Sequence, residues 1–405
     1  MGSVGRRRVL MTSPTFWPLS DGVANSAGIY AKTLKQAGFD VTVLTWRRGD
    51  LESSAVLNGI NIRRLCVAGS ANVLDRYRGN LAELETFVRE QEYDILIVHC
   101  WQIWSTDLVL KFSRRYKPKI PTVMVSHGLS TNTLSTWSAR LKYPFWRRYQ
   151  KQIVPDMVRA VSKFVVLSDY ADEDRFLDVK IARDLGVRYE VVPNVPGYDP
   201  VLAKKGPVTE YRQLHKQRYC LCVGAFNSKK NEMFVLDAFV RASLRNTSLV
   251  VVGYRENGYS AKLRRFADKH SVSDRVFIFS GLSQEEIFFL YEHAWVYLCG
   301  SRTECQPIVI LDAMASKTPF ISTPVGCVPN LPGGLTVKSP TDMAKALNSL
   351  ASSEEQYRQL QTDGARAIEN VFSKTKVGEK IEGVLRDLLL QEAGGKKLAR
   401  MERSH

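Results

Sequence analysis

Short apolar runs alternate with amphipathic stretches along almost the whole chain, and this alternation constrains the fold more than any other feature. The stretch between the first two runs ends at Gly38 and has helical spacing, with apolar residues at Val23, Ala27, Tyr30, Leu34 and Ala37. Strands that alternate with helices form parallel sheets covered on both faces. The strands predicted in the first half are Val9–Ser13, Val41–Leu44, Ile62–Val67, Ile95–His99, Thr122–Ser126, Phe164–Leu167 and Tyr189–Val192.

The alternation stops once, near the middle of the chain, and then starts again. Residues 193–200 contain three prolines and a glycine, and the charged stretch that follows has no clear periodicity. We therefore predict an α/β fold with two doubly wound, Rossmann-like domains that face a central cleft. Their predicted bounds are 1–200 and 219–372, with a linker at 201–218 and a C-terminal helix and basic tail at 373–405. The strands predicted after the break are Tyr219–Val223, Leu249–Val252, Val276–Phe279, Trp295–Leu298 and Pro319–Ser322.

The charge of the chain favours an anionic partner. Its formal net charge is +16, which suits a nucleotide, a phospholipid surface or a nucleic acid without choosing among them. A chain of 405 residues, of which 44% are hydrophobic, is long and apolar enough for two cores.

Neither the cysteines nor the apolar runs indicate a secreted or membrane-spanning protein. The seven cysteines lack the spacing of a zinc site or a disulfide framework, and we interpret them as reduced core thiols. No apolar run approaches the roughly 20 residues that span a bilayer, and the basic N-terminus leads directly into a short strand. We predict a cytoplasmic protein, for which peripheral attachment to the inner face of the membrane stays open.

Two carboxylates, Glu304 and Asp312, flank a proline, Pro307, between an apolar run and a helix. Pro307 suits the first helical turn, so Glu304 is expected in the strand-to-helix loop and Asp312 about two turns into the helix. Backbone N–H groups at a helix start hold phosphates, and carboxylates accept hydrogen bonds from sugar hydroxyls. The arrangement suits a nucleotide-sugar, although an isolated pair of this kind is more often two surface acids.

Over nearly its whole length the chain resembles the retaining GT-B glycosyltransferases of glycosyltransferase family 4. The most specific segment is 301–326, where an acid, a proline, a second acid, a small helix and Thr318-Pro319 keep the order of the family. The resemblance implies the GT-B fold and transfer of a hexose from a UDP- or GDP-linked donor with retention at the anomeric carbon. The other similar blocks are Val9–Met11, Pro18–Val23, Pro193-Asn194, Tyr219–Gly224, Leu249–Gly253 and Asp274–Val276.

The resemblance implies a role for each residue of the predicted site. As catalytic residues, Glu304 contacts the donor sugar, Lys230 neutralises the departing diphosphate, and His127 hydrogen-bonds the sugar. Asp312 binds the ribose hydroxyls, and the further donor-binding residues are Gly22, Gln306, Ile308 and Arg302.

Each of these residues also has a purely structural interpretation, such as a solvated turn lysine, a strand-end histidine or a turn glycine. The chain also departs from the family at two positions. Asp312 replaces the usual glutamate and is one methylene shorter, and Ala225 replaces the usual arginine. The second positive charge would then come from Arg302, Lys229 or Arg255.

We predict no metal and no cofactor, because the nucleotide-sugar is itself the substrate and the implied mechanism needs neither. Asp172-Glu173-Asp174 resembles a metal-binding Asp-x-Asp motif, but its acidic surroundings are typical of a solvated helix face.

Basic and aromatic residues gather between Lys111 and Lys163, where Asp156 is the one charged acid. Such a mixture suits an anionic lipid surface, and a solvated helix whose aromatics pack into the core explains it equally well. We predict a saccharide or glycolipid acceptor, such as a lipid-linked precursor in cell-envelope polysaccharide synthesis. The aromatic residues of the segment include Trp137, Tyr143, Phe145, Trp146 and Tyr149.

Three other functions are compatible with parts of the sequence. A nucleotide-sugar epimerase or a sugar phosphorylase on the same fold stays open as the alternative. A nicotinamide-dependent dehydrogenase is disfavoured because no GxGxxG follows the first strand. A nucleic-acid partner is not predicted, because no zinc finger, RNA-binding signature or helix-turn-helix accompanies the charge.

Overall fold

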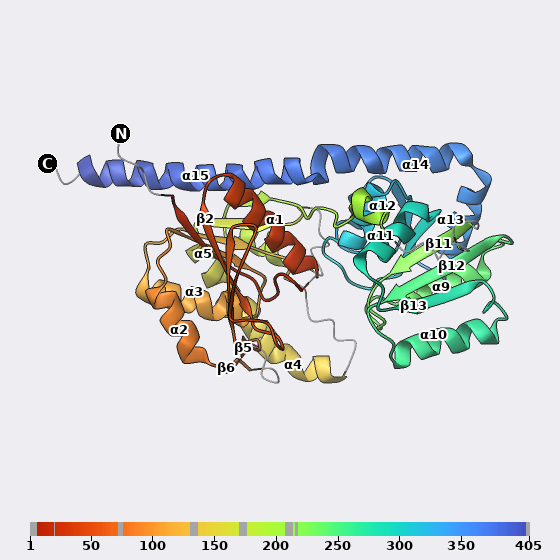
Figure 1. Cartoon of the computed structure of the whole chain (residues 1–405), viewed down its shortest axis with the longest axis horizontal. Coiled ribbons are helices and arrows are strands. Elements are labelled where there is room, and N and C mark those ends of the chain that lie inside the picture. Colours follow the sequence, from red (N-terminus) through yellow and green to blue (C-terminus); the bar gives the residue numbers. More distant parts are fainter. Residues whose placement is uncertain are drawn as a thin grey trace. The chain divides into compact units, whose positions relative to one another are not determined.

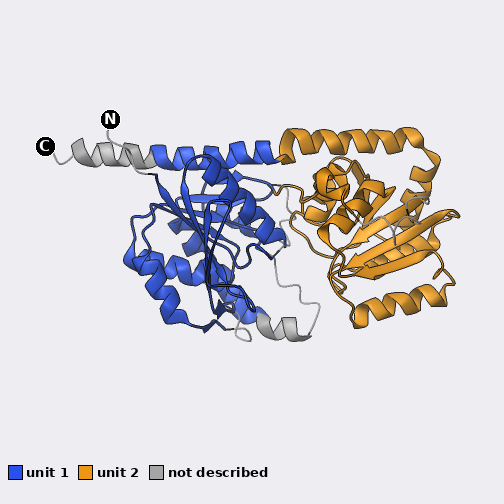
Figure 2. Ribbon diagram, viewed as in Figure 1, with its two compact units in different colours: residues 1–169, 173–193, 374–405 blue, residues 170–172, 194–373 orange. Residues whose placement is uncertain are grey.

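The computed structural model divides the chain into two compact units (Figures 1 and 2). Unit 1 comprises residues 1–169, 173–193 and 374–405, and unit 2 comprises residues 170–172 and 194–373. The structure describes residues 6–19, 21–71, 76–129, 137–169, 176–206, 214 and 218–401, with side chains left out at 137–142 and 391–401.

Unit 1 is built on an eight-stranded sheet with the order β10-β9-β8-β7-β1-β2-β4-β3. All neighbours pair in parallel except β3, which forms an antiparallel hairpin with β4. A separate antiparallel pair consists of β5 (Val67–Ala68) and β6 (Arg78–Gly79). The strands of the main sheet are β1 (Arg8–Thr12), β2 (Asp40–Trp46), β3 (Ser54–Leu57), β4 (Ile60–Leu65), β7 (Ile95–His99), β8 (Thr122–Val125), β9 (Lys163–Val166) and β10 (Tyr189–Val191).

Helices cover this sheet because successive strand residues point to opposite faces and both faces are apolar. Leu10 and Leu96 pack into a cluster with residues of α2, α3, α5 and α6, whereas Val9 and Met11 are buried on the opposite face. The C-terminal helix α15 packs against α1. The helices of unit 1 are α1 (Gly22–Gln36), α2 (Leu81–Glu90), α3 (Trp104–Tyr116), α4 (Trp137–Arg148), the π-helical η1 (Tyr149–Ile153), α5 (Val154–Ala160), α6 (Asp178–Asp184) and α15 (Lys374–Met401).

Unit 2 has a six-stranded, wholly parallel sheet with the order β13-β12-β11-β14-β15-β16. Strand β11 shows how its sequence fills both faces. Cys220 and Cys222 pack with α9 (Glu232–Arg241), α10 (Gly258–Lys269) and α13 (Pro340–Ser352). Tyr219 and Leu221 pack on the other face with α11 (Gln284–His293) and α12 (Ile308–Ala315). The strands are β11 (Arg218–Val223), β12 (Thr247–Gly253), β13 (Val276–Ser280), β14 (Val296–Cys299), β15 (Phe320–Ser322) and β16 (Gly334–Thr336).

The helices of unit 2 are mostly capped by side chains at their starts. Ser283 and Asn257 form capping boxes at α11 and α10, which satisfies N–H groups that the helix leaves free. The helices are α7 (Pro200–Ala203), α9 (Glu232–Arg241), α10 (Gly258–Lys269), α11 (Gln284–His293), α12 (Ile308–Ala315), the 3-10 turn η2 (Val328–Asn330), α13 (Pro340–Ser352), α14 (Glu354–Ala367) and the π-helical η3 (Ile368–Phe372).

The twelve predicted strands are all present, with ends that differ by a few residues. The domain bounds differ more: residues 194–200 belong to unit 2, and 374–405 belong to unit 1. Most of the predicted linker, 201–218, lies outside the described residues. All seven cysteines are free, but Cys66 is exposed, so the prediction of a core thiol is wrong there.

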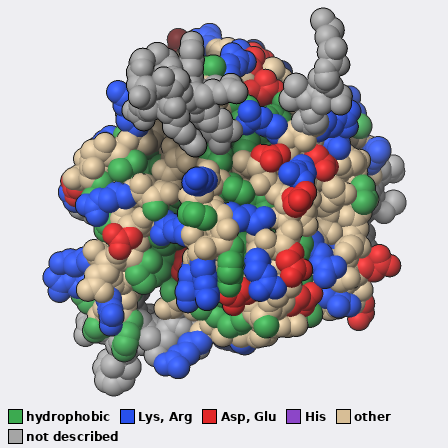
Figure 3. Space-filling model, turned by 90° about the vertical axis from the view of Figure 1, so that its left-hand side faces the viewer, with side chains coloured by type: hydrophobic (Ala, Val, Ile, Leu, Met, Phe, Trp, Pro, Cys, Tyr) green, Lys and Arg blue, Asp and Glu red, His purple; other side chains and the backbone are tan. Residues whose placement is uncertain are grey.

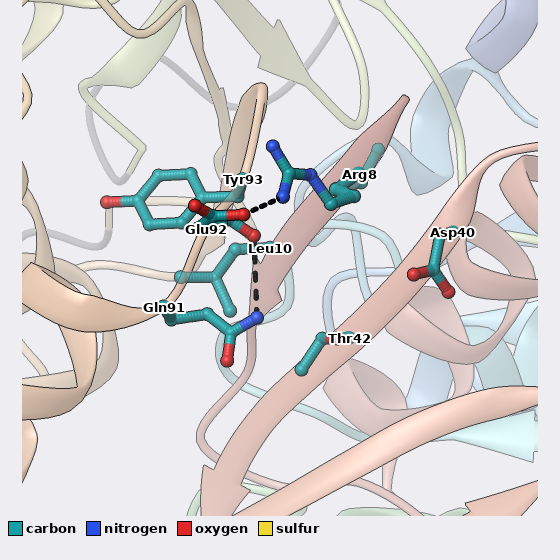
Figure 4. A pocket seen from close by; sticks show the side chains of 8 residues that line it. Arg8, Leu10, Asp40, Thr42, Gln91, Glu92 and Tyr93 are labelled. Carbon is teal, nitrogen blue, oxygen red and sulfur yellow. Dashed lines mark hydrogen bonds and ion pairs between the residues drawn. The ribbon is translucent and has the colours of Figure 1, made fainter. Parts of the chain in front are cut away.

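A small hollow of about 20 Å³ lies at the amino-terminal edge of the sheet in unit 1 (Figure 4). It is lined by the first residues of β1 and β2 and by the turn before β7, and Arg8 pairs there with Glu92. This volume holds about one water molecule, so the hollow is too small for a substrate.

Candidate functional site

Each sheet has one point at which the strand order reverses, and ligands of doubly wound folds bind beyond the carboxyl ends of the strands there. In unit 2 the reversal lies between the adjacent strands β11 and β14, because β12 and β13 follow on one side and β15 and β16 on the other. In unit 1 the reversal lies between the adjacent strands β1 and β7. The loops after these four strands are therefore where functional side chains are expected.

In unit 2 the structure brings Lys230 and Glu304 together at this point. Lys230 lies in the loop after β11, and Glu304 lies in the loop after β14. The Lys230 ammonium donates to Glu304 Oε1 at 2.6 Å, and the Ser301 hydroxyl donates to the same oxygen at 2.9 Å. Two residues that are 74 positions apart in the sequence thus form one ion pair.

Hydrogen bonds join the two loops and fix the position of this pair. The Arg302 N–H donates to Lys229 O at 2.8 Å, and Asn231 Nδ2 donates to Gly300 O at 3.1 Å. Asn227 Oδ1 accepts from the N–H groups of Lys229 and Lys230, which closes a tight turn. The lysine is therefore presented by a loop with a defined shape.

Gly326 supports the Glu304 loop from the other side. Its φ is +52°, and a Cβ atom there would lie 2.2 Å from Glu304 O and 2.1 Å from Cys305 O. Only glycine fits this close approach of two backbones. The contact holds Glu304 against the segment that follows β15.

The charge of Lys230 is maintained although the side chain is partly buried. Burial alone lowers its pKa, but the charge and the hydrogen bond of Glu304 outweigh this effect and raise the pKa above its ordinary value. A point charge at the carboxyl edge of the sheet is available to an anionic ligand.

A second acid, Glu232, is the first residue of α9, two positions after Lys230, and it is fully buried. Burial raises its pKa to about 7, although Lys230 and the backbone N–H groups of Glu232 and Asn227 partly offset this. Nothing in the sequence pattern singles Glu232 out, because acids are common in the first turn of a helix, where they interact favourably with the helix dipole.

Asp312 and Gln306 contact the chain segment that opens unit 2. Asp312 is 8% exposed, and its carboxylate accepts from the Tyr198 N–H at 2.8 Å. Gln306 Oε1 accepts from the Asn194 N–H at 2.6 Å, and Asn194 Nδ2 donates to Gln306 O at 3.3 Å. Burial raises the pKa of Asp312 to about 7, and the N–H groups of Tyr198 and Gly197 oppose that rise.

The remaining predicted residues of unit 2 surround the same edge of the sheet. Ile308 is the first residue of α12, and N–H groups in a first helical turn have no intrahelical acceptor. Pro307 is the N-cap of this helix and not part of its first turn. Arg302, Lys229 and Arg255 are exposed on the loops after β14, β11 and β12, where each could add the second positive charge.

In unit 1 the corresponding edge carries a pair of histidines. His127 follows β8 and His99 ends β7, and His99 Nδ1 lies 3.0 Å from His127 Nε2. Burial lowers the pKa of His127 to about 4 against a smaller opposing effect of Asp21. Burial and the neighbouring His127 also lower the pKa of His99 well below its ordinary value. Both rings are neutral at neutral pH, so one donates to the other and the free nitrogen of His127 has a defined role as donor or acceptor.

His99 had no predicted role, although one signal was present in the sequence. It ends a strand that is adjacent in sequence to the strand before His127, and neighbouring parallel strands end at the same edge. On the other side of His127, the Ser126 hydroxyl accepts from Trp101 Nε1 at 2.6 Å and donates to Asp178 at 2.5 Å. These bonds hold the backbone at His127 in place.

Gly22 is the first residue of α1, directly after its N-cap Asp21. The Asp21 carboxylate accepts from the N–H groups of Val23 and Ala24 at 2.9 and 2.8 Å. A phosphate at this helix start would have to compete with that carboxylate. A sugar hydroxyl is the more suitable neighbour for Gly22.

Among the described residues, no group of three or more His, Cys, Asp or Glu side chains is arranged to hold a metal ion. Asp172-Glu173-Asp174 lies outside those residues. In the part of the chain that the structure describes, no helix combines the length and apolar character needed to cross a membrane.

Two family models match the chain, one in each half. Residues 20–196 match the model described as Glycosyltransferase Family 4, and residues 210–367 match the model described as Glycosyl transferases group 1. No curated protein matches the chain in sequence.

Many solved structures share the fold. Sucrose-phosphate synthase from Thermosynechococcus elongatus is 17% identical with a TM-score of 0.75, and the match covers 95% of this chain and 100% of that one. HepE from Anabaena, solved with UDP-glucose, is 14% identical with a TM-score of 0.66 and coverages of 94% and 99%. WaaG, a glycosyltransferase involved in lipopolysaccharide biosynthesis, is 18% identical with a TM-score of 0.60 and coverages of 93% and 100%. At such identities the likeness shows the fold alone, and it confirms the predicted fold class.

Proposed function

Because the chain belongs to the GT-B glycosyltransferases of glycosyltransferase family 4, we propose that it is a retaining hexosyltransferase that uses a UDP- or GDP-linked sugar as donor. The observation that carries this proposal is the Lys230–Glu304 pair at the carboxyl ends of β11 and β14. A cation and a carboxylate acceptor stand side by side there, which suits the diphosphate and the sugar hydroxyls of one donor molecule.

In the proposed reaction the bond between the anomeric carbon and the diphosphate breaks while the acceptor hydroxyl attacks from the same face. Because the acceptor hydroxyl itself attacks the anomeric carbon, no protein nucleophile is required, and its proton passes to the departing phosphate oxygen. The Lys230 charge stabilises the negative charge that develops on the diphosphate. Glu304 orients the donor sugar through its hydroxyls, and His127 offers a ring nitrogen to a sugar hydroxyl.

For the nucleoside, we propose that Asp312 accepts hydrogen bonds from the ribose hydroxyls, with Gln306, Ile308 and Arg302 at the same helix start and loop. The support is their place at one edge of one sheet. The Asp312 contact with Tyr198 competes with this role, because it occupies one oxygen of the carboxylate.

Donor binding is the first prediction that tests the proposal. At about a hundredfold excess over Kd, a bound ligand adds about 2.7 kcal/mol to the free energy of unfolding. We expect one sugar from a panel of UDP- and GDP-sugars to raise the melting temperature of the wild type. Glu304→Gln should lose that rise, because its amide can no longer accept two sugar hydroxyls.

Glu355→Gln is the matched control, because Glu355 is exposed on α14. It should keep the full rise in melting temperature. A rise of equal size in Glu304→Gln would refute the assignment of Glu304. Analysis of the products then separates transfer to an acceptor from epimerisation or phosphorolysis of the sugar.

For the acceptor we propose a lipid-linked saccharide, reached from an anionic membrane surface. The support comes from α4 and η1, where Phe145 is 56% exposed and Ile153 is 44% exposed. An open hollow of about 470 Å³ lies beside them, lined by Tyr143, Pro144, Arg147, Arg148, Lys151 and Gln152. Apolar and basic side chains are thus exposed together.

Other observations limit the extent of this surface. Tyr149 is buried in the core of unit 1 and cannot contact lipid. On the face drawn in Figure 3, basic side chains are spread among acidic and apolar ones, so charge alone marks no binding surface there. The side chain of Trp137 lies outside the described residues.

Flotation with vesicles that contain phosphatidylglycerol tests this surface. We expect the wild type to float, and the triple variant Phe145→Ser, Arg147→Gln, Arg148→Gln to bind at least about tenfold more weakly, because each basic residue contributes about 1 kcal/mol near an anionic surface. Arg264→Gln and Arg265→Gln on α10 form a control pair in unit 2. Equal binding by the triple variant, or no binding by the wild type, would contradict the proposal.

A further inference from the structure

The buried position of Glu232 is unusual for an acid. Its side chain is fully buried, and Oε1 lies 3.2 Å from the position of a Cβ atom built on Gly224. Among the described residues neither carboxylate oxygen has a hydrogen-bond partner of normal geometry. An ionised carboxylate in such a place is shielded from solvent, and the nearby N–H groups of Glu232 and Asn227 offset this loss only in part, so its charge is unfavourable.

The titratable groups that face Glu232 come from three elements. They are Lys230 from its own loop, Cys222 from β11 and Tyr259 from α10. Burial raises the pKa of the Cys222 thiol and of the Tyr259 hydroxyl, so both stay neutral at neutral pH. Lys230 is the charged member of this set, and its charge compensates Glu232 together with the backbone N–H groups of Glu232 and Asn227.

Lys230 is thus shared between two acids. It donates a hydrogen bond to Glu304, and it compensates Glu232 through charge alone. A diphosphate bound at Lys230 brings further negative charge to the same place. An ionised Glu232 then becomes less favourable, because like charges repel strongly where water is excluded.

We propose that Glu232 is a positioning residue that takes up a proton from solvent when the diphosphate of a nucleotide-sugar binds at Lys230. Protonation removes the competing negative charge, and Lys230 can then direct its charge to the diphosphate. This inference rests on the proposed function, because it requires the donor diphosphate to bind at Lys230.

The sign of the pH dependence follows from linkage. In the ligand-free protein, burial raises the pKa of Glu232 to about 7, and the bound diphosphate raises it further. Well below this pH, Glu232 is already protonated and binding takes up no proton. Above it, binding takes up as much as one proton, and affinity falls by at most about tenfold for each pH unit.

Isothermal titration calorimetry with UDP-glucose and GDP-mannose measures this uptake. The phosphates of a nucleotide diphosphate sugar do not titrate near neutral pH, so protons taken up there belong to the protein. At about pH 7.5, in two buffers of different ionisation enthalpy, we expect the wild type to take up about half a proton to one proton. Glu232→Gln should lose that uptake and keep only the exchange of other groups such as Asp312, so its affinity should fall less steeply than that of the wild type above about pH 7. Glu355→Gln should behave as the wild type.

Unfolding without ligand provides an independent measurement. The ratio of folded to unfolded wild type should fall relative to Glu232→Gln as the pH rises from about 5 to 8, because the folded wild type holds its proton up to a higher pH. Parallel stability curves of the wild type and Glu232→Gln would overturn the inference. So would zero proton uptake by a wild type that binds the donor, and this second result needs no folded variant. If neither nucleotide-sugar binds the wild type, the proposed donor site fails and the coupling with it, while diverging curves would still show that Glu232 titrates.

Discussion

Replacing Lys230 by methionine should lower the turnover number about 10²- to 10³-fold, which is the usual cost of removing one group that stabilises charge in a transition state. Methionine keeps much of the length of the side chain and removes its charge. The negative charge that develops on the departing diphosphate would lose the cation proposed to stabilise it. Glu304 keeps its hydrogen bond from Ser301 in the variant, so the loop should retain its shape.

The rate of nucleotide diphosphate release from the donor identified by thermal shift measures this effect. Lys262→Met is the matched control, since Lys262 is exposed on α10 and undergoes the same chemical change. Lys230→Arg should recover part of the rate, because a positive charge returns with a different geometry. A turnover number within about threefold of the wild type in Lys230→Met would show that the departing charge is stabilised elsewhere, for example by Arg302.

The strands were predictable because parallel strands buried on both faces are continuous apolar runs. Strand β12 illustrates this, since all seven of its residues are buried. The hairpin strand β3 was missed because Ser54–Leu57 is largely exposed and its sequence resembles a loop. The place of α15 in unit 1 was not predictable, because it depends on packing against α1 and not on any local pattern.

The site was predictable only in part, for a related reason. Lys230 and Glu304 lie in loops after apolar strands, so the positions of these loops could be predicted from the apolar runs. The roles of the two residues came from the resemblance to the family. The contacts of Asp312 and Gln306 with Tyr198 and Asn194 join residues more than a hundred positions apart. No spacing within a single helix indicates which distant N–H group a buried carboxylate will meet.

Asp312→Asn should make the protein more stable at alkaline pH and a weaker binder of the donor. Burial raises the pKa of this carboxyl from 3.8 to about 7 in the folded state. Its contribution to stability is therefore fully present below about pH 4 and is lost as the pH rises through about 7. At about 1.4 kcal/mol for each pKa unit, the loss approaches 4 kcal/mol at pH 8.

Asparagine avoids this loss because it does not ionise, and its Oδ1 can still accept from the Tyr198 N–H. Chemical denaturation between about pH 5 and pH 8 should show the variant gaining stability over the wild type across that range. Asp274→Asn, at an exposed position before β13, should show no such gain.

The Kd of Asp312→Asn for the donor then shows why an acid occupies this position. A carboxylate can accept from two ribose hydroxyls, whereas the amide offers one acceptor oxygen, so the Kd for the donor should rise about tenfold, equivalent to about 1.4 kcal/mol. A protein that keeps a destabilising group at neutral pH gives up stability for function. Higher stability together with weaker donor binding in Asp312→Asn is the result expected from that exchange. If stability rises and the Kd is unchanged, Asp312 does not bind the ribose, and its contact with Tyr198 is its main role.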